Sequence, residues 1–257
     1  MAEEIFFADG VISSITTYPD TGHAESLHYH ETLHVSYVLK GGNVEKRTTH
    51  DIERLPGIVT WYEAGELHRS TKTLAASKHI NLEVEQAFLQ QYAIDVKPAG
   101  EAFLKSPDAA FIMLKILKEL QVKDAFTKHS IHLLAINLLT TGRKQNNYAA
   151  MPQWLHTIYT LLHDRWNENV TLRDLALAAN VHPVTVSKYF PRYFGCTMGE
   201  YMRKIKIEKA LVLVTSSYLP LTEISNECGF TDQSHFIRTF KQQTGFLPLQ
   251  YRKYVHC

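Results

Sequence analysis

Histidines cluster in the first third of the chain at a spacing that suits a shared pocket. Residues 28–42 read HYHETLHVSYVLKGG, with histidines at positions 28, 30 and 34. Side chains two residues apart on a β-strand point to the same face, so we expect His28, His30 and His34 to line one side of a strand. Neutral imidazoles bind divalent transition metals and also hydrogen-bond polar ligands. The stretch therefore predicts one wall of a metal site, of a ligand chamber or of a packed interior.

A second group of residues with possible chemistry lies in an internal repeat near the C-terminus. The pattern Phe-x4-Gly-x5-Tyr occurs at 190–201 and again at 240–251, with a basic residue two positions before each Phe. Similar helical sequences precede the two copies, LRDLALAANV and LTEISNECGF. The offset is 49 or 50 residues throughout, so one structural unit occurs twice.

Each copy of the repeat predicts a helix, a short turn and a second helix. The first helices cover 172–179 and 221–228, and the second helices begin at 183 and 232. In a helix-turn-helix unit the second helix lies in the major groove of DNA and its first residues meet base edges. A connecting helix at 199–215 would be ~25 Å long at ~1.5 Å per residue. That length suits two reading helices on one DNA face, where successive turns are ~34 Å apart.

The elements before the repeat change type near residue 85. Short β-type runs separated by Gly, Pro, Asp and Asn fill residues 5–85 and predict antiparallel strands in a sandwich or barrel. Apolar residues then recur at helical spacing in 108–121 and 125–142, which predicts two amphipathic helices in a hairpin. The polar segment 142–152 predicts a linker. We therefore expect two domains, 1–147 and 148–257, and an α+β fold.

Composition sets the broad class. The 257 residues are 45% hydrophobic and 21% charged, as in soluble globular proteins. No apolar run is long enough for a bilayer and the start lacks the pattern of a signal peptide, so we expect a cytoplasmic protein without membrane contact. Three cysteines without C-x-x-C spacing predict neither a disulfide framework nor a cysteine zinc site. Residues 1–150 carry a net charge of −3 and 151–257 carry +4, which favours the second half as the one that meets a polyanion.

Residues 155–255 resemble the AraC-type (AraC/XylS) transcription regulators. The positions that carry the resemblance are Ala210, Leu213, Ile224, Gly229, Phe230, Ser234, Phe236, Phe240, Lys241, Gly245, Pro248, Tyr251 and Arg252. The resemblance implies a sequence-specific binder of double-stranded DNA that works with RNA polymerase. It assigns base reading to Val184, Ser187 and Lys188 in the first unit and to Gln233, His235 and Arg238 in the second.

The first unit departs from the family pattern at its second helix. Pro191 stands inside that helix, where the family usually carries a basic residue, and an interior proline removes a backbone hydrogen bond. This predicts a kink and puts the docking of Phe194 in doubt. His182 stands where a Ser cap is usual, whereas we expect Thr231 to cap the second unit. Lys204, Lys206, Arg192 and Lys241 are candidates for phosphate contacts or for plain solvation.

The histidine stretch is similar to the first of two cupin motifs. The spacing is Gly22-x5-His28-x-His30-x3-His34-x6-Gly41, followed by Gly57-x5-Glu63-x-Gly65-x2-His68. Cupins supply two His and a Glu from the first motif and a His from the second; here His34 replaces the Glu, Glu63 a Pro and Lys72 an Asn. The resemblance implies a cupin-like β-barrel that senses an effector. Either His28, His30, His34 and His68 bind one divalent transition metal, or they hydrogen-bond an organic effector or one another.

Two functions compete for this arrangement. In the first, a regulator binds a small-molecule effector in the barrel, dimerises through the hairpin stripe and reads DNA with the repeat. The stripe consists of Ile112, Ile116, Leu120, Leu134 and Leu138; its alternative role is to pack on its own barrel. The rival is a cupin dioxygenase or isomerase with an accessory helical tail. Because an enzyme has no use for paired reading helices, the repeat predicts a homodimeric regulator that is not an enzyme.

Overall fold

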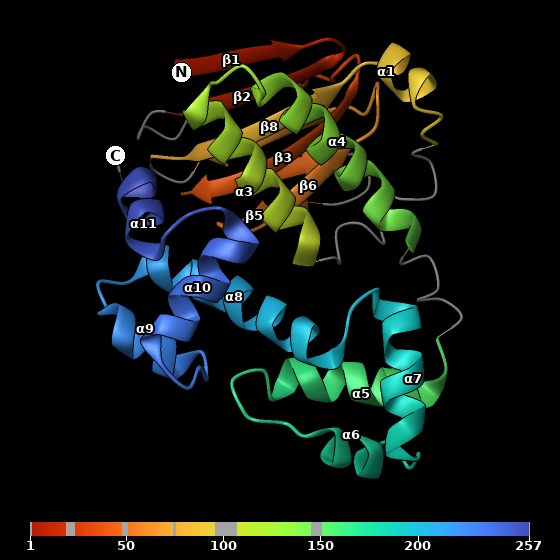
Figure 1. Cartoon of the computed structure of the whole chain (residues 1–257). Coiled ribbons are helices and arrows are strands. Elements are labelled where there is room, and N and C mark those ends of the chain that lie inside the picture. The colour runs from red at the N-terminus through yellow and green to blue at the C-terminus, as the bar shows by residue number, and fades with distance from the viewer. Residues whose placement is uncertain are drawn as a thin grey trace.

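The computed structural model describes residues 2–18, 24–47, 51–73, 76–95, 107–144 and 151–256. The N-terminal part contains two antiparallel sheets and a helical hairpin, and the C-terminal part is entirely helical in the described residues (Figure 1). The predicted domain boundary at 147 lies outside the described residues.

Strands form two separate sheets, of order β1-β2-β8-β3-β6 and β5-β4-β7. Their bounds are β1 (Ala2–Ala8), β2 (Val11–Thr17), β3 (Leu33–Lys40), β4 (Asn43–Arg47), β5 (Asp51–Arg54), β6 (Val59–Tyr62), β7 (His68–Thr73) and β8 (Lys78–Val84). The antiparallel strands predicted within residues 5–85 are confirmed in type. The predicted closed barrel is wrong, because in the described residues each strand order runs from one edge strand to another without closing, so both sheets are open.

Strand β3 shows how the sequence separates two environments. Its residues from Leu33 to Leu39 are all buried. Alternation sends His34 and Ser36 toward the space between the sheets, while Val35 and Tyr37 join the hydrophobic core. A strand with one polar and one apolar face, both covered, therefore stands between a polar cavity and the helices.

The helical hairpin covers the apolar side of the five-stranded sheet (Figure 1). It consists of α3 (Pro107–Val122) and α4 (Thr127–Lys144), which confirms the two predicted helices, and α1 (Gln86–Gln91) precedes it. Ile112, Ile116 and Leu138 of the predicted dimer stripe are at most 4% exposed within one chain. Their burial agrees with the alternative role of the stripe, which was packing on its own domain.

The C-terminal part contains two helix-turn-helix units on one long helix, α8 (Met198–Ser216). The first unit comprises α6 (Leu172–Ala178) and α7 (Pro183–Phe194), preceded by α5 (Gln153–Asp164); the second comprises α9 (Leu221–Glu227) and α10 (Gln233–Thr244), followed by α11 (Pro248–His256). All predicted helices of the repeat are present. At ~1.5 Å per residue, the 19 residues of α8 span ~28 Å between the units.

The two units belong to different hydrophobic cores. The core of the second unit, including Phe236, Phe240 and Tyr251, is continuous with the core of the N-terminal sheet and hairpin. The core of the first unit, including Val186 and Phe190, is separate and closes around the first half of α8. In packing terms, the second unit is thus attached to the N-terminal part and the first is held mainly by α8.

Candidate nucleic-acid interface and polar cavity

Both units turn between their helices through a left-handed residue. Asn180 has φ +51° and Gly229 has φ +65° at the equivalent places. A Cβ at Gly229 would lie 1.9 Å from the carbonyl oxygen of Asn167. Glycine is therefore required at residue 229, whereas the first unit uses an asparagine, a residue type that tolerates this conformation.

Side chains cap both reading helices at their N-termini. His182 accepts a hydrogen bond at Nδ1 from the backbone N–H of Val184, at 3.3 Å. In the second unit Asp232 accepts from the N–H of His235, at 2.7 Å. The expected cap Thr231 is wrong by one residue, because Asp232 holds the extended backbone from which a side chain reaches the first turn.

Five of the six residues expected to read bases are exposed at the start of these helices. They are Val184, Ser187, Lys188, Gln233 and Arg238. His235 is half-buried, with its ring 5.4 Å from that of Phe230. The two caps lie 50 residues apart, so Lys188 and Arg238 occupy equivalent positions, whereas the counterpart of Gln233 is Pro183.

The basic residues near these helices divide into two classes. Lys204 pairs with Asp108 of α3 at 2.7 Å, and Lys206, only 8% exposed, donates to the carbonyl of Gly229 at 2.7 Å. These two lysines are therefore engaged in internal contacts. Arg192 and Lys241 are exposed on α7 and α10, and the Arg192 guanidinium lies 4.9 Å from the centre of the Tyr189 ring. They remain available to phosphates.

The proline inside α7 leaves the packing of that helix intact. Pro191 lies within the helix, which continues to Phe194. Phe194 is 4% exposed, and its ring stacks on Phe190 with centroids 4.2 Å apart. Phe194, whose docking Pro191 had put in doubt, is therefore docked, because this stacking holds the last turn of the helix in the core.

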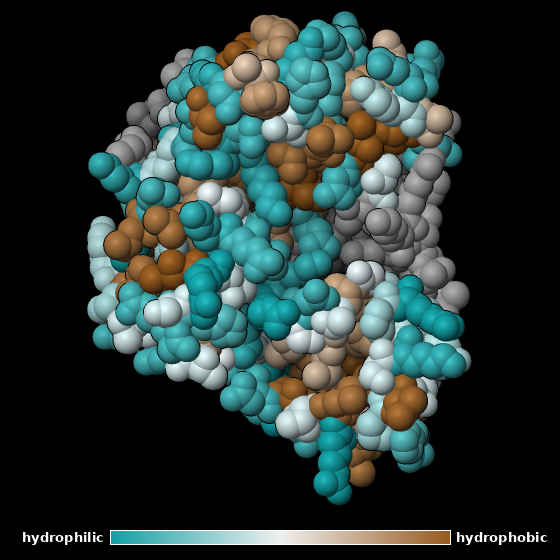
Figure 2. All heavy atoms as spheres, viewed as in Figure 1, coloured by the Kyte–Doolittle hydropathy of each residue, from teal (hydrophilic) through white to brown (hydrophobic). Residues whose placement is uncertain are grey.

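Apolar side chains also reach the surface of the first unit. In Figure 2, brown groups lie at the left and toward the top of the face shown, and brown residues also gather at the lower right, over α6 and α7. Leu177 is 82% exposed and Val184 is 61% exposed there. An exposed valine at the start of a reading helix can contact the methyl group of thymine.

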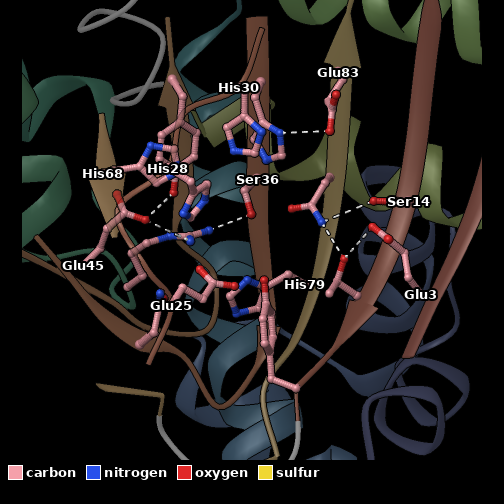
Figure 3. A pocket seen from close by; sticks show the side chains of 17 residues that line it. Glu3, Ser14, Glu25, His28, His30, Ser36, Glu45, His68, His79 and Glu83 are labelled. Atoms are coloured by element: carbon pink, nitrogen blue, oxygen red, sulfur yellow. Dashed lines mark hydrogen bonds and ion pairs between the residues drawn. The ribbon is translucent and has the colours of Figure 1, made fainter. Parts of the chain in front are cut away.

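A polar cavity of about 160 Å³ lies between the two sheets (Figure 3). Its lining residues are Glu3, Ser14, Thr16, Tyr18, Glu25, His28, His30, His34, Ser36, Asn43, Glu45, Arg54, Tyr62, His68, His79, Asn81 and Glu83. Among the described residues that line it, none is aliphatic. The cavity therefore suits a hydrophilic occupant, since an apolar one would leave these groups without hydrogen-bond partners.

All four predicted histidines line this cavity, though not from one strand. His28 and His30 precede β3, and only His34 is in the strand, because the ladder begins at Leu33. His28 instead forms an isolated bridge with His68 from the other sheet. The expected convergence is thus found, but the expected single strand carrying 28, 30 and 34 is wrong.

The imidazoles form two donor groups that share His30. His28, His30 and His68 make one group, and His30, His34 and Glu83 make the other; within each, one ligand atom per residue lies within 4.8 Å of the others. Nδ1 of His28 and Nδ1 of His68 each lie 2.9 Å from a backbone carbonyl oxygen, so these nitrogens carry the proton and leave Nε2 as the acceptor.

Glu83 is the residue that the sequence analysis missed. It faces His34 across the β3–β8 ladder, with a carboxylate oxygen 3.5 Å from Nδ1 of His34. The signal was in the sequence, because His79, Asn81 and Glu83 alternate along one predicted strand and all line the cavity.

Among the residues that line the cavity, an arginine and a glutamate form a buried ion pair. The Arg54 guanidinium donates to Ser36 Oγ at 2.6 Å and to Thr60 Oγ1 at 2.9 Å, and lies 3.4 Å from a carboxylate oxygen of Glu45. Tyr62 donates to the same carboxylate at 2.6 Å. Arg54 and Glu45 are at most 4% exposed, so this buried pair is held by several hydrogen bonds.

Burial sets the protonation of the cavity. It lowers the pKa of His30 to about 3, together with the neighbouring imidazoles of His34 and His68. Burial likewise lowers the pKa of His68 and, strongly, that of His79. The imidazole of His34, 3.5 Å from a carboxylate oxygen of Glu83, lowers the pKa of that carboxyl. At neutral pH these three histidines are neutral and Glu83 is ionised, which is the state that binds cations.

Comparison with known proteins identifies the helical part. Residues 175–254 match the family described as "Helix-turn-helix domain". An alignment of 260 positions, 25% of them identical, covers 88% of this chain and 86% of the uncharacterised HTH-type transcriptional regulator YdeC of Bacillus subtilis. It is 31% identical to the uncharacterised HTH-type transcriptional regulator YisR of Bacillus subtilis over 94 residues, 37% of this chain and 33% of that protein.

Solved structures also resemble parts or most of the chain. The C-terminal domain of AraT, a response regulator from Geobacillus stearothermophilus, is 29% identical with a TM-score of 0.38, over 40% of this chain and 86% of that one. ToxT from Vibrio cholerae is 10% identical with a TM-score of 0.39, over 96% of this chain and 98% of that one. No helix in the described ranges is long and apolar enough to cross a bilayer.

Proposed function

We propose that this chain is a DNA-binding transcription regulator and not an enzyme, and that it reads DNA with both units. Its C-terminal part matches a helix-turn-helix family, and the relatives that it matches are named HTH-type transcriptional regulators. The observation that carries the proposal is the exposure of capped helix starts in both units, with Lys188 and Arg238 at equivalent positions. Lysine and arginine both bind the acceptors of guanine in the major groove, and arginine does so through two hydrogen bonds.

The experiment is a titration of one bound DNA fragment and one random fragment at several salt concentrations. We expect tighter binding to the specific fragment and a fall in both affinities with salt, because basic residues release counterions from phosphates. Removal of residues 151–257 should abolish binding to both fragments. Equal affinity for the two fragments at every salt concentration would refute sequence-specific reading.

We further propose that the cavity between the sheets is the effector site, as the cupin resemblance implies. Four carboxylates, from Glu3, Glu25, Glu45 and Glu83, face a single arginine, Arg54. With neutral histidines, the lining carries excess negative charge. These features support a hydrophilic effector that is cationic or rich in hydroxyl groups, or a metal ion.

The residues present fit a divalent transition metal. The four histidines expected from the spacing would hold it: His28, His30 and His68 form one donor group, and His34 joins through the group that it makes with His30 and the carboxylate of Glu83. The metal would act as a ligand that draws the two sheets together, because His68 comes from one sheet and His34 from the other. Backbone bonds at Nδ1 of His28 and His68 already orient Nε2 for binding.

Titration with Zn²⁺ after treatment with a chelator tests the metal proposal. We expect one ion per chain, with an affinity that falls at acid pH as the imidazole ligands protonate. Because burial lowers the pKa of His30 to about 3, this fall continues well below pH ~6.5. His30→Ala should weaken binding most, because His30 belongs to both donor groups. An unchanged Zn²⁺ affinity in His30→Ala would contradict the proposal and leave an organic effector.

The strands that line the cavity also support the second unit, which suggests how an effector acts. On its other face β3 carries Tyr37, whose hydroxyl is hydrogen-bonded to the hydroxyl of Tyr251 of α11. At the start of β8, the Lys78 ammonium lies 4.1 Å from the centre of the Tyr254 ring. A shift of β3 or β8 on ligand binding would therefore move α11.

Amide hydrogen exchange with and without Zn²⁺ tests this route. We expect exchange to change in α11 and not in α6, because α6 belongs to the separate core. Tyr37→Phe, which removes the hydroxyl that is hydrogen-bonded to Tyr251, should reduce the change in α11. A change confined to residues around the cavity would show that binding does not reach the second unit.

We also propose a homodimer and contact with RNA polymerase. Since the hairpin stripe is buried, the dimer surface must be formed by other residues. Phe126 is 72% exposed and Leu133 is 69% exposed on the outer side of the hairpin, and they support that surface as the dimer contact. Phe126→Glu with Leu133→Glu should lower the mass in sedimentation without unfolding; an unchanged dimer would place the contact elsewhere.

A further inference from the structure

A hydrogen bond joins the first turns of the two helices in the second unit. The Thr222 hydroxyl, at the second residue of α9, donates to Oε1 of Gln233, the first residue of α10, at 2.8 Å. Both residues are exposed, so this bond forms on the surface at the start of the reading helix. It contributes nothing to the hydrophobic core.

The bond defines which way the Gln233 amide faces. A glutamine amide has an acceptor oxygen and a donor nitrogen, and a free side chain can present either one to a base. With Oε1 held by the Thr222 hydroxyl, Nε2 keeps both hydrogens and Oε1 keeps one lone pair. The order of donor and acceptor along the groove is therefore fixed, which is what a two-bond contact to adenine requires.

The first unit has no such pair, which makes it an internal comparison. Pro183 occupies the place of Gln233 and has no side-chain donor or acceptor. Arg173, at the second residue of α6, occupies the place of Thr222. The bond is thus a property of the second unit and not a requirement of the helix-turn-helix fold.

We infer that Thr222 is a positioning residue for base recognition, which holds Gln233 in one orientation and so sharpens the choice of one base pair. The inference rests on the proposed role of α10 as a reading helix. Thr222 itself need not touch DNA, because its hydroxyl is directed at Gln233.

Two substitutions at the same position separate the hydroxyl from the shape of the side chain. Thr222→Val keeps the branched shape without the hydroxyl, and Thr222→Ser keeps the hydroxyl. Gln233→Ala first identifies the base pair that Gln233 reads, as the position of the selected DNA site where preference is lost. The full chain is then titrated with the four base-pair variants of that position and with random DNA.

We expect Thr222→Val to reduce the preference at that base pair about three- to tenfold, the worth of one net hydrogen bond. Other positions and the affinity for random DNA should not change, and Thr222→Ser should behave as the parent. An unchanged preference in Thr222→Val, or an equal loss on all sequences, would overturn the inference and leave Gln233 as a reader. If Gln233→Ala itself alters no preference, the assignment of Gln233 as a reader fails, and the inference fails with it.

Discussion

At the scale of single residues, the two candidate sites depend on opposite kinds of environment. Arg238 and Gln233 are exposed at a helix start, where they can replace water by base edges. His30 and His34 lie between two sheets, where burial keeps His30 neutral. Effects of substitution at the first site should therefore appear in DNA preference, and those at the second in pH dependence and ligand binding.

Arg238→Ala should reduce discrimination at one or two base pairs by ~1–3 kcal/mol, because a guanidinium can form two hydrogen bonds with guanine. Lys241→Ala is the matched control on the same helix, since an exposed lysine in the last turn of α10 would meet phosphate. Lys241→Ala should weaken binding to all DNA sequences alike. Competition titrations with specific and random DNA measure both effects, and equal losses on the two DNAs for Arg238→Ala would show that it does not read bases.

The free energy of unfolding should fall as pH is lowered from about 6.5 toward 5. The pKa of His30 is lowered in the folded chain, so over this range the unfolded chain binds a proton that the folded chain does not. His30→Asn should reduce this acid sensitivity, while the neutral-pH stability provides the reference. Urea unfolding at several pH values measures the free energy of unfolding. The same dependence on pH in His30→Asn as in the parent would contradict the lowered pKa of His30.

At the scale of elements, the sequence predicted what local patterns determine. Helical spacing of Ile112 and Ile116 defines α3, and the Phe-x4-Gly-x5-Tyr repeat defines both units. Closure of the sheets was not predictable, because it depends on which strand edges pair. Nor was Glu83 recognised as a partner of His34, since their contact depends on the β3–β8 register. The cap Asp232 shows the usual uncertainty of one residue at a helix end.

Gly229→Ala and Gly195→Ala should differ in cost although both glycines have positive φ. At Gly195 no atom lies within 4 Å of a new Cβ, so the cost is the left-handed backbone alone, ~1–2 kcal/mol. At Gly229 the Cβ would also meet the Asn167 carbonyl at 1.9 Å. We expect Gly229→Ala to lower the free energy of unfolding by about 3 kcal/mol or more. Thermal unfolding compares the pair, and equal costs would contradict the close approach at the turn.

At the scale of the whole molecule, the two reading units are attached differently. The second unit shares a core with the N-terminal sheet, whereas the first has a core of its own. Asp108 and Lys204 add an ion pair between α3 and α8. An effector in the cavity would thus reach the second unit directly and the first only through α8.

Ile116→Glu should unfold the N-terminal part and the second unit together. Ile116 is 0% exposed in their common core, so the substitution buries an unpaired charge, at a cost of more than about 4 kcal/mol. Leu133→Glu, on the exposed side of α4, is the control that should remain folded. Circular dichroism with limited proteolysis follows each part; a folded Ile116→Glu monomer would contradict the shared core.

Selection of bound sequences from a random DNA pool tests most directly the claim that both units read DNA. We predict an enriched site with two clusters of preferred base pairs, about 10 base pairs apart from centre to centre, because α8 sets the two helices on one face of the duplex. Selection with Arg238→Ala should lose preference in one cluster, and selection with Lys188→Ala in the other. A single short cluster that is unchanged in either variant, or no enrichment at all, would contradict the account.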